Sequence, residues 1–155
     1  MTDIGDIASR VEGLARRLAG PEARATGLRR LSVGASQEIW SFDIETGAQT
    51  AGYILRRSPG GVTTTPSAQA IGLATEAAVI DAARAAGAPA PVVAHVCDEA
   101  DGLGSAYVMG RLSGETIARK ILRDEAFAGA RPRLARQCGA AIARIHATPP
   151  ETLPA

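Results

Sequence analysis

Tyr53-Ile54-Leu55-Arg56-Arg57 is a short run of strand-forming residues that ends in two cations. Side chains alternate between the two faces of a strand, so Arg56 points from the same face as Ile54. An arginine on an apolar strand face needs a carboxylate partner, because burying an unpaired charge is costly. The stretch therefore predicts a strand of a sheet with an acidic residue packed against it.

The expected partner lies about twenty residues later, on a helix predicted within 71–83. Helical spacing puts Glu76 on the stripe that should pack against a sheet. The same stripe contains Leu73, Ile80 and Ala83. We therefore predict an ion pair between Arg56 and Glu76. A strand cation held by a helix glutamate is how kinase-like folds hold ATP phosphates, and the alternative is a purely structural pair.

The order of the motifs resembles the amino-terminal lobe of the aminoglycoside phosphotransferase family. The matching segments are 28–42, 53–59, the helix with Glu76, 91–96, 107–115 and 138–146. The resemblance implies an α+β fold, a protein-kinase-like N-lobe with a five-stranded, mostly antiparallel sheet, one packed helix and flanking helices. It also implies ATP as cofactor, with Mg in a complete enzyme. Leu-Arg-Arg at 55–57 is similar to the branch associated with acyl-CoA dehydrogenases, which favours a substrate other than an antibiotic.

The resemblance further implies how the phosphates are held. The turn 32–37 would cover them, with backbone N–H groups around Gly34 and the hydroxyl of Ser36 as donors. Arg56 stands where many relatives carry lysine, and its guanidinium still grips phosphate with two hydrogen bonds. Glu76 would hold Arg56 in place.

An adenine pocket is implied next to the phosphates, lined by apolar side chains with backbone donors at its back. Ile39 and Ile54 would sandwich the ring. Met109 begins the hinge, where the carbonyl of Arg111 and the N–H of Leu112 would pair with the adenine edge. The alternative for these residues is ordinary core packing.

Hydrophobic periodicity predicts the element order. An amphipathic helix is expected within 1–20. The resemblance implies a kinase-like lobe with its hinge within 27–114, and the start of a second lobe, truncated before the catalytic loop, within 115–155. The first helix is expected to pack on its own lobe, with partner binding as the alternative. Strands are expected near Leu28–Val33, Ile39–Thr46, Gly52–Arg57, Val92–Cys97 and Ala106–Leu112. The stretch Asp98–Gly104 is expected to form an acidic hairpin turn, and Ser67 to cap the helix that follows it.

The closing helix carries an apolar stripe at helical spacing. It consists of Leu134, Cys138, Ala141, Ile142 and Ile145. A stripe of that length rarely stays in water, so we expect it either to fold back on the lobe or to form a homodimer through 131–147, and we favour the dimer.

The family's catalytic half carries a His-Gly-Asp-type loop and a metal-binding aspartate. Here His146 is followed by Ala-Thr-Pro-Pro, so neither a catalytic base nor a metal ligand is assigned. We expect a catalytically incomplete chain, either a piece of a longer kinase or a naturally shortened lobe. Transfer to a small-molecule acceptor would then belong to the full-length protein. The alternative is a non-enzymatic interaction or regulatory module with the same lobe.

Composition limits the function classes. With 155 residues and a formal charge of +1, the chain can bury one modest core, and it offers no basic field for nucleic acid. No stretch is apolar and long enough to span a bilayer, so a cytoplasmic location without membrane contact is expected. Cys97 and Cys138 are expected to be reduced core residues. His95 and Cys97 share a strand face, but no further ligand has suitable spacing, so no metal site is expected.

Overall fold

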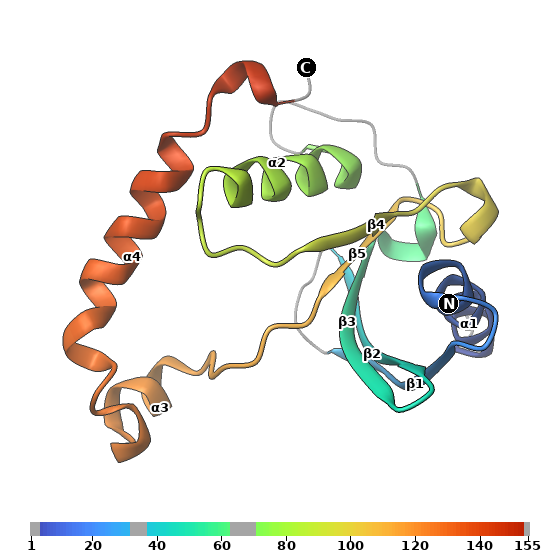
Figure 1. Ribbon diagram of the computed structural model, residues 1–155, viewed down its shortest axis with the longest axis horizontal. Coiled ribbons are helices and arrows are strands. Elements are labelled where there is room, and N and C mark those ends of the chain that lie inside the picture. Colours follow the sequence, from blue (N-terminus) through green and yellow to red (C-terminus); the bar gives the residue numbers. More distant parts are fainter. Residues whose placement is uncertain (1–3, 32–36, 63–70, 154–155) are drawn as a thin grey trace.

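The computed structural model describes residues 4–31, 37–62 and 71–153. The strands are β1 (Arg24–Leu31), β2 (Glu38–Thr46), β3 (Gln49–Arg57), β4 (Val93–Val96) and β5 (Ala106–Gly110). They form one antiparallel sheet in the order β1-β2-β3-β5-β4. The helices are α1 (Ile4–Ala19), α2 (Leu73–Ala85), α3 (Ala118–Arg123) and α4 (Arg131–His146). This confirms the α+β, kinase-like lobe (Figure 1).

The larger core lies between α1 and one face of the sheet. Helical spacing puts one side of α1 in this core, namely Ile7, Val11, Leu14 and Ala15, none more than 1 % exposed. The sheet contributes Trp40, Phe42, Ile44, Leu55 and Val108. The expectation that the first helix packs on its own lobe is therefore confirmed, and α1 belongs to the same folded unit as the sheet.

The second, smaller core lies on the opposite face, under α2. Leu73 and Ala77 of the helix pack against Tyr107 of β5, with Met109 at the margin. Because side chains alternate along β5, Val108 enters the α1 core while Tyr107 and Met109 face α2. The sheet thus separates two hydrophobic cores. The predicted Arg56–Glu76 pair lies on the α2 face.

Several strand boundaries differ from those expected. β1 begins at Arg24, four residues early, because Gly27 adopts φ +63° where the register with β2 shifts, so the glycine is accommodated within the strand. β3 begins at Gln49, since Thr46 and Gln49 pair across a tight turn that contains Gly47 at φ +59°.

The last two strands are shorter than expected, as β4 ends at Val96 and β5 at Gly110. The turn between them is the predicted acidic hairpin, with a short 3-10 helix at Glu99–Asp101. Further 3-10 turns lie at Pro59–Gly61, Glu125–Phe127 and Pro150–Thr152. The proposed cap Ser67 and the strand end Val33 lie outside the described residues.

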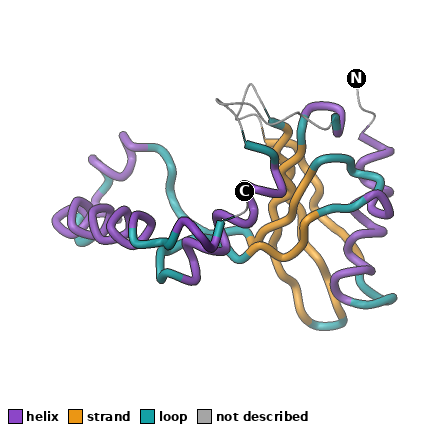
Figure 2. The backbone as a smooth tube through the Cα atoms, turned by 90° about the horizontal axis from the view of Figure 1, so that it is seen from above, coloured by secondary structure: helices purple, strands orange, loops and turns teal. Residues whose placement is uncertain are grey.

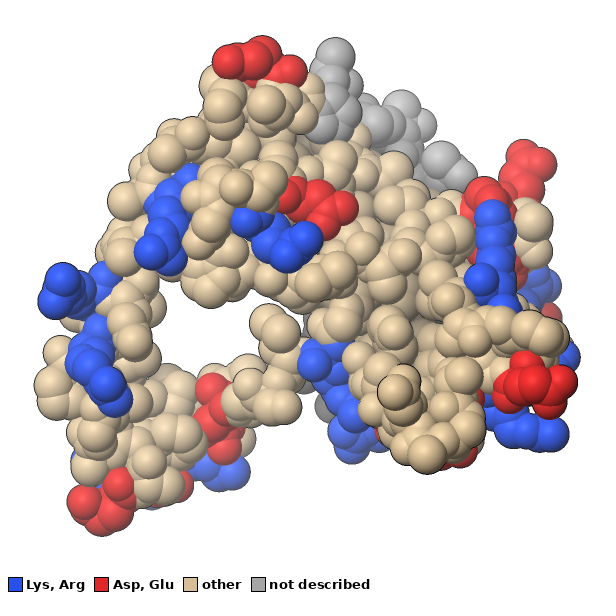
Figure 3. All heavy atoms as spheres, in the orientation of Figure 1, with Lys and Arg blue, Asp and Glu red and all other residues tan. Residues whose placement is uncertain are grey.

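Helices α3 and α4 form an arm that extends away from the sheet (Figure 2). Figure 3 shows an open space between this arm and the rest of the molecule. Ile142 and Ile145 are 52 % and 48 % exposed, so the apolar stripe does not fold back on the lobe. Cys138 is exposed on α4, and the expectation of a core residue there was wrong, because this helix does not pack on the sheet. The homodimer through 131–147 stays a prediction.

None of the described helices is long and apolar enough to cross a membrane.

Gly104 allows two turns to approach each other closely. It adopts φ +69°, and a Cβ atom there would overlap the carbonyl oxygen of Gly61, which accepts a hydrogen bond from the Ser105 N–H. We expect Gly104→Ala to lower the free energy of unfolding by about 2 kcal/mol or more, since left-handed backbone alone costs alanine roughly 1–2 kcal/mol. The midpoint of thermal unfolding should fall by roughly 4–8 °C.

The matched control is Gly13→Ala. Gly13 is exposed in the middle of α1 with no heavy atom near its missing Cβ. Alanine there should raise stability by up to about 1 kcal/mol, because it is the better helix former. If Gly104→Ala melts like wild type, the close approach of the two turns is not present in solution.

Candidate functional site

The predicted ion pair between Arg56 and Glu76 is present on the α2 face. Nε of Arg56, on β3, lies 2.9 Å from Oε1 of Glu76, in the first turn of α2. Their side chains are 30 % and 25 % exposed, so the pair sits at the rim of the small core. Strand alternation and helix spacing therefore predicted both the pairing and the face.

Tyr107 is a third member of this site that the sequence did not single out. It lies opposite Arg56 in the β3–β5 ladder, and its hydroxyl donates a hydrogen bond of 2.9 Å to Oε1 of Glu76. Burial, together with the adjacent Glu76 carboxylate, raises the pKa of the Tyr107 hydroxyl. The phenol therefore stays protonated and keeps donating. The sequence feature that could have identified Tyr107 is its alternation with Met109 along the expected strand, which puts both side chains on one face.

The guanidinium of Arg56 is fixed along one edge only. Its Nε is buried and close to Glu76, yet that approach lacks hydrogen-bond geometry. Within the described residues, its two terminal amino groups have no hydrogen-bond partner. A guanidinium held at its base with both ends open is arranged to grip an oxyanion with two parallel hydrogen bonds.

The three apolar candidates for the adenine pocket gather beside this cation. Ile39 of β2 pairs with Arg56 of β3, and Ile54 pairs with Met109 of β5. Cross-strand partners point to the same face, so all three side chains share the face of Arg56. Each is half-buried. They form an apolar surface next to a cation, the combination that a flat base with attached phosphates requires.

Arg111 has a side-chain role that the sequence did not reveal. Its N–H donates to the carbonyl of Gly52 at 2.9 Å, which continues the ladder one residue past β5. Its guanidinium lies across Gly52, donating to Oγ of Ser41 at 3.0 Å and to Oδ1 of Asp43 at 2.6 Å. A Cβ on Gly52 would lie 2.5 Å from this guanidinium, so the glycine leaves the necessary room.

The remaining predicted residues are less defined. Leu112 follows the ladder and is 68 % exposed. The predicted pairing of the Arg111 carbonyl and the Leu112 N–H with a base stays a prediction. Gly34 and Ser36, assigned to the phosphate turn, lie outside the described residues.

Comparison with known proteins gives one family. A family model described as "Phosphotransferase enzyme family" matches residues 27–155, which is most of the chain and includes every residue of the site described above. No curated protein matches the sequence.

Proposed function

This chain belongs to the phosphotransferase enzyme family, and we propose that it is the ATP-binding lobe of a kinase that phosphorylates a small-molecule hydroxyl. The observation that carries the proposal is the half-fixed guanidinium of Arg56, whose terminal amino groups are open on the α2 face. In a purely structural ion pair the same amino groups would be hydrated, since the Arg56 side chain is 30 % exposed, so nucleotide binding is the measurement that separates the two interpretations.

Arg56 would bind the phosphates of ATP. Hydrogen bonds between an ionised donor and an ionised acceptor are about twice as strong as neutral ones, and a guanidinium can make two to one phosphate. Glu76 would keep the guanidinium in position, and Tyr107 would keep Glu76 in position through its hydrogen bond. Phosphoryl transfer depends mostly on positioning and charge stabilisation, so a fixed cation is the expected protein contribution from this lobe.

The base would lie on the apolar surface of Ile39, Ile54 and Met109. Flat aromatic ligands favour such surfaces, and backbone groups of the hinge would supply the polar contacts. Magnesium, which phosphotransferases generally use with ATP, would supply positive charge that offsets the charge of the phosphates. No residue of this chain is assigned as its ligand or as catalytic base, so we expect these 155 residues to bind ATP without steady turnover, in a cytoplasmic setting.

Calorimetric titrations with ATP and with adenosine, both in the presence of magnesium, test this function. ATP should bind at least about tenfold more tightly than adenosine, because charge-assisted hydrogen bonds to phosphate contribute roughly 1.5–3 kcal/mol. A parallel phosphate-release assay should stay at background. The absence of ATP binding would favour a non-enzymatic module. Equal affinities for ATP and adenosine would show that Arg56 does not bind the phosphates.

A further inference from the structure

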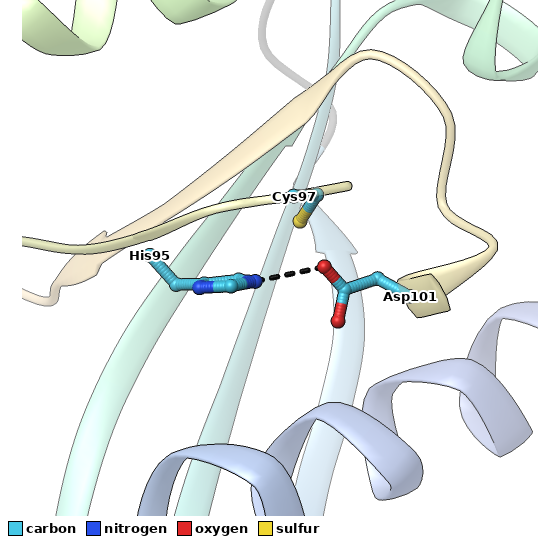
Figure 4. A group of neighbouring side chains, drawn as sticks. All are labelled: His95, Cys97 and Asp101. Carbon is cyan, nitrogen blue, oxygen red and sulfur yellow. Dashed lines mark hydrogen bonds and ion pairs between the residues drawn. The ribbon is translucent and has the colours of Figure 1, made fainter. Parts of the chain in front are cut away.

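His95, Cys97 and Asp101 form a compact cluster on the other face of the sheet, toward α1. His95 lies in β4, Cys97 directly follows that strand, and Asp101 ends the 3-10 turn Glu99–Asp101. One potential ligand atom from each residue lies within 4.8 Å of the other two. Figure 4 shows the imidazole, the thiol and the carboxylate directed toward one another. The expectation that no third ligand is at hand was therefore wrong.

The turn brings Asp101 to the strand. The side chain of Asp98 accepts hydrogen bonds from the N–H groups of Ala100 and Asp101, and Asp101 in return accepts one from the Asp98 N–H. This reciprocal cap turns the Asp101 carboxylate back over β4, where its side chain is only 2 % exposed. Sequence spacing predicts the turn but not the direction of this carboxylate.

The two carboxylate oxygens of Asp101 have different surroundings. Oδ1 accepts a hydrogen bond from Arg17 of α1 at 3.0 Å. Oδ2 lies 2.7 Å from Nε2 of His95 and accepts the Asp98 N–H at 2.9 Å. Arg17 also makes two hydrogen bonds to Asp98, so its charge is shared between two carboxylates. Metal-binding carboxylates usually carry such outer hydrogen bonds, which fix their orientation.

A hollow borders the cluster on the side of Cys97. It has a volume of about 280 Å³ and is lined by Cys97, Asp98, Glu99, Gly104 and Ser105. An ion would enter from this side, where a water molecule would serve as a further ligand. An entry path is required of a metal site that is filled in the folded protein.

We propose that His95, Cys97 and Asp101 bind a divalent transition-metal ion, and that zinc fits this site best. Zinc accepts nitrogen, sulfur and oxygen ligands together, and three protein ligands plus water are a common zinc arrangement. Bonds of about 2.0–2.3 Å place tetrahedral ligand atoms roughly 3.3–3.8 Å apart. That spacing is longer than the 2.7 Å between Nε2 of His95 and Oδ2 of Asp101. It is shorter than the 4.8 Å within which all three potential ligand atoms lie of one another.

Charge favours the same ion. A thiolate and a carboxylate together neutralise a divalent cation, and histidine binds as a neutral ligand. Bound zinc would join β4, the turn before β5 and, through Arg17, helix α1. The site lies on the opposite face from Arg56, so it is independent of nucleotide binding.

To test the site, zinc chloride is titrated into chelator-treated protein in the absence of nucleotide, and binding is measured by calorimetry. Wild type should bind one ion per chain. Cys97→Ser and His95→Gln should each weaken binding at least about tenfold, because loss of even a hydrogen-bonding partner of a metal ligand typically costs about 10–100-fold in affinity. Cys138→Ser is the matched control, since it removes the other cysteine, exposed on α4, and should bind like wild type. Circular dichroism checks that each variant is folded.

Cobalt substitution provides a second readout that does not need the ligand variants to fold. The chain has two cysteines, so a thiolate-to-cobalt absorption band in Cys138→Ser arises from Cys97 alone. We expect this band in both wild type and Cys138→Ser. The proposal is overturned if wild type binds no stoichiometric zinc, if Cys97→Ser and His95→Gln bind as wild type does, or if the cobalt band disappears in Cys138→Ser.

Discussion

An Arg57→Ala variant is expected to lose about 3–5 kcal/mol of folding free energy, the usual cost of removing one partner from a buried ion pair. Arg57 is 5 % exposed and points to the opposite face from Arg56. Its Nη1 donates to Oε2 of Glu38 at 3.1 Å, and its Nε donates to the carbonyl of Leu103 at 2.6 Å. Alanine would leave the buried Glu38 carboxylate and the Leu103 carbonyl without these partners.

Urea unfolding followed by circular dichroism measures this loss. A double variant, Arg57→Met with Glu38→Leu, should recover much of it, because both buried charges are then gone and the apolar stems keep similar volume. Arg56→Ala is the matched control and should lose less, since the Arg56 side chain is 30 % exposed. A loss below about 1 kcal/mol for Arg57→Ala would mean that this pair is hydrated in solution.

The neighbouring arginines show what strand alternation can predict. Alternation with Ile54 assigned Arg56 to the face of Glu76, and the structure agrees. The same rule sends Arg57 to the other face, but its partners come from β2 and from the turn before β5. Those contacts depend on strand order and register, which no local pattern contains. The sequence therefore predicted one arginine's partner and was silent on the other's.

The site was predicted in part for the same reason. The resemblance assigned Ile39, Ile54 and Met109 to one pocket, and the register of β2, β3 and β5 places them on one face. Tyr107 and the guanidinium of Arg111 were missed, because their partners lie on elements distant in sequence. Helix α4 was predicted from its periodicity, but whether its stripe is covered depends on packing that periodicity does not describe.

Replacing Arg56 tests the phosphate site most directly, and Arg56→Ala is expected to lower ATP affinity at least about tenfold while adenosine binds as before. The separation follows from the geometry, since the guanidinium lies beside the apolar surface and not within it. Arg56→Lys should fall between wild type and alanine, because an ammonium keeps the charge but cannot make the two parallel hydrogen bonds. Arg30→Ala, on β1 and stacked over Trp40, controls for the loss of an arginine elsewhere.

The Glu76→Gln variant distinguishes two roles within the ion pair, namely orienting Arg56 and contacting the nucleotide. An amide needs no countercharge, so this variant should fold with little loss but orient Arg56 less well, and ATP affinity should drop by a smaller factor than in Arg56→Ala. Thermal melts with and without ATP measure both effects, because a ligand that binds only the folded state raises the midpoint. If ATP stabilises wild type, Arg56→Ala and Glu76→Gln by the same amount, the pair is structural and the phosphates bind elsewhere.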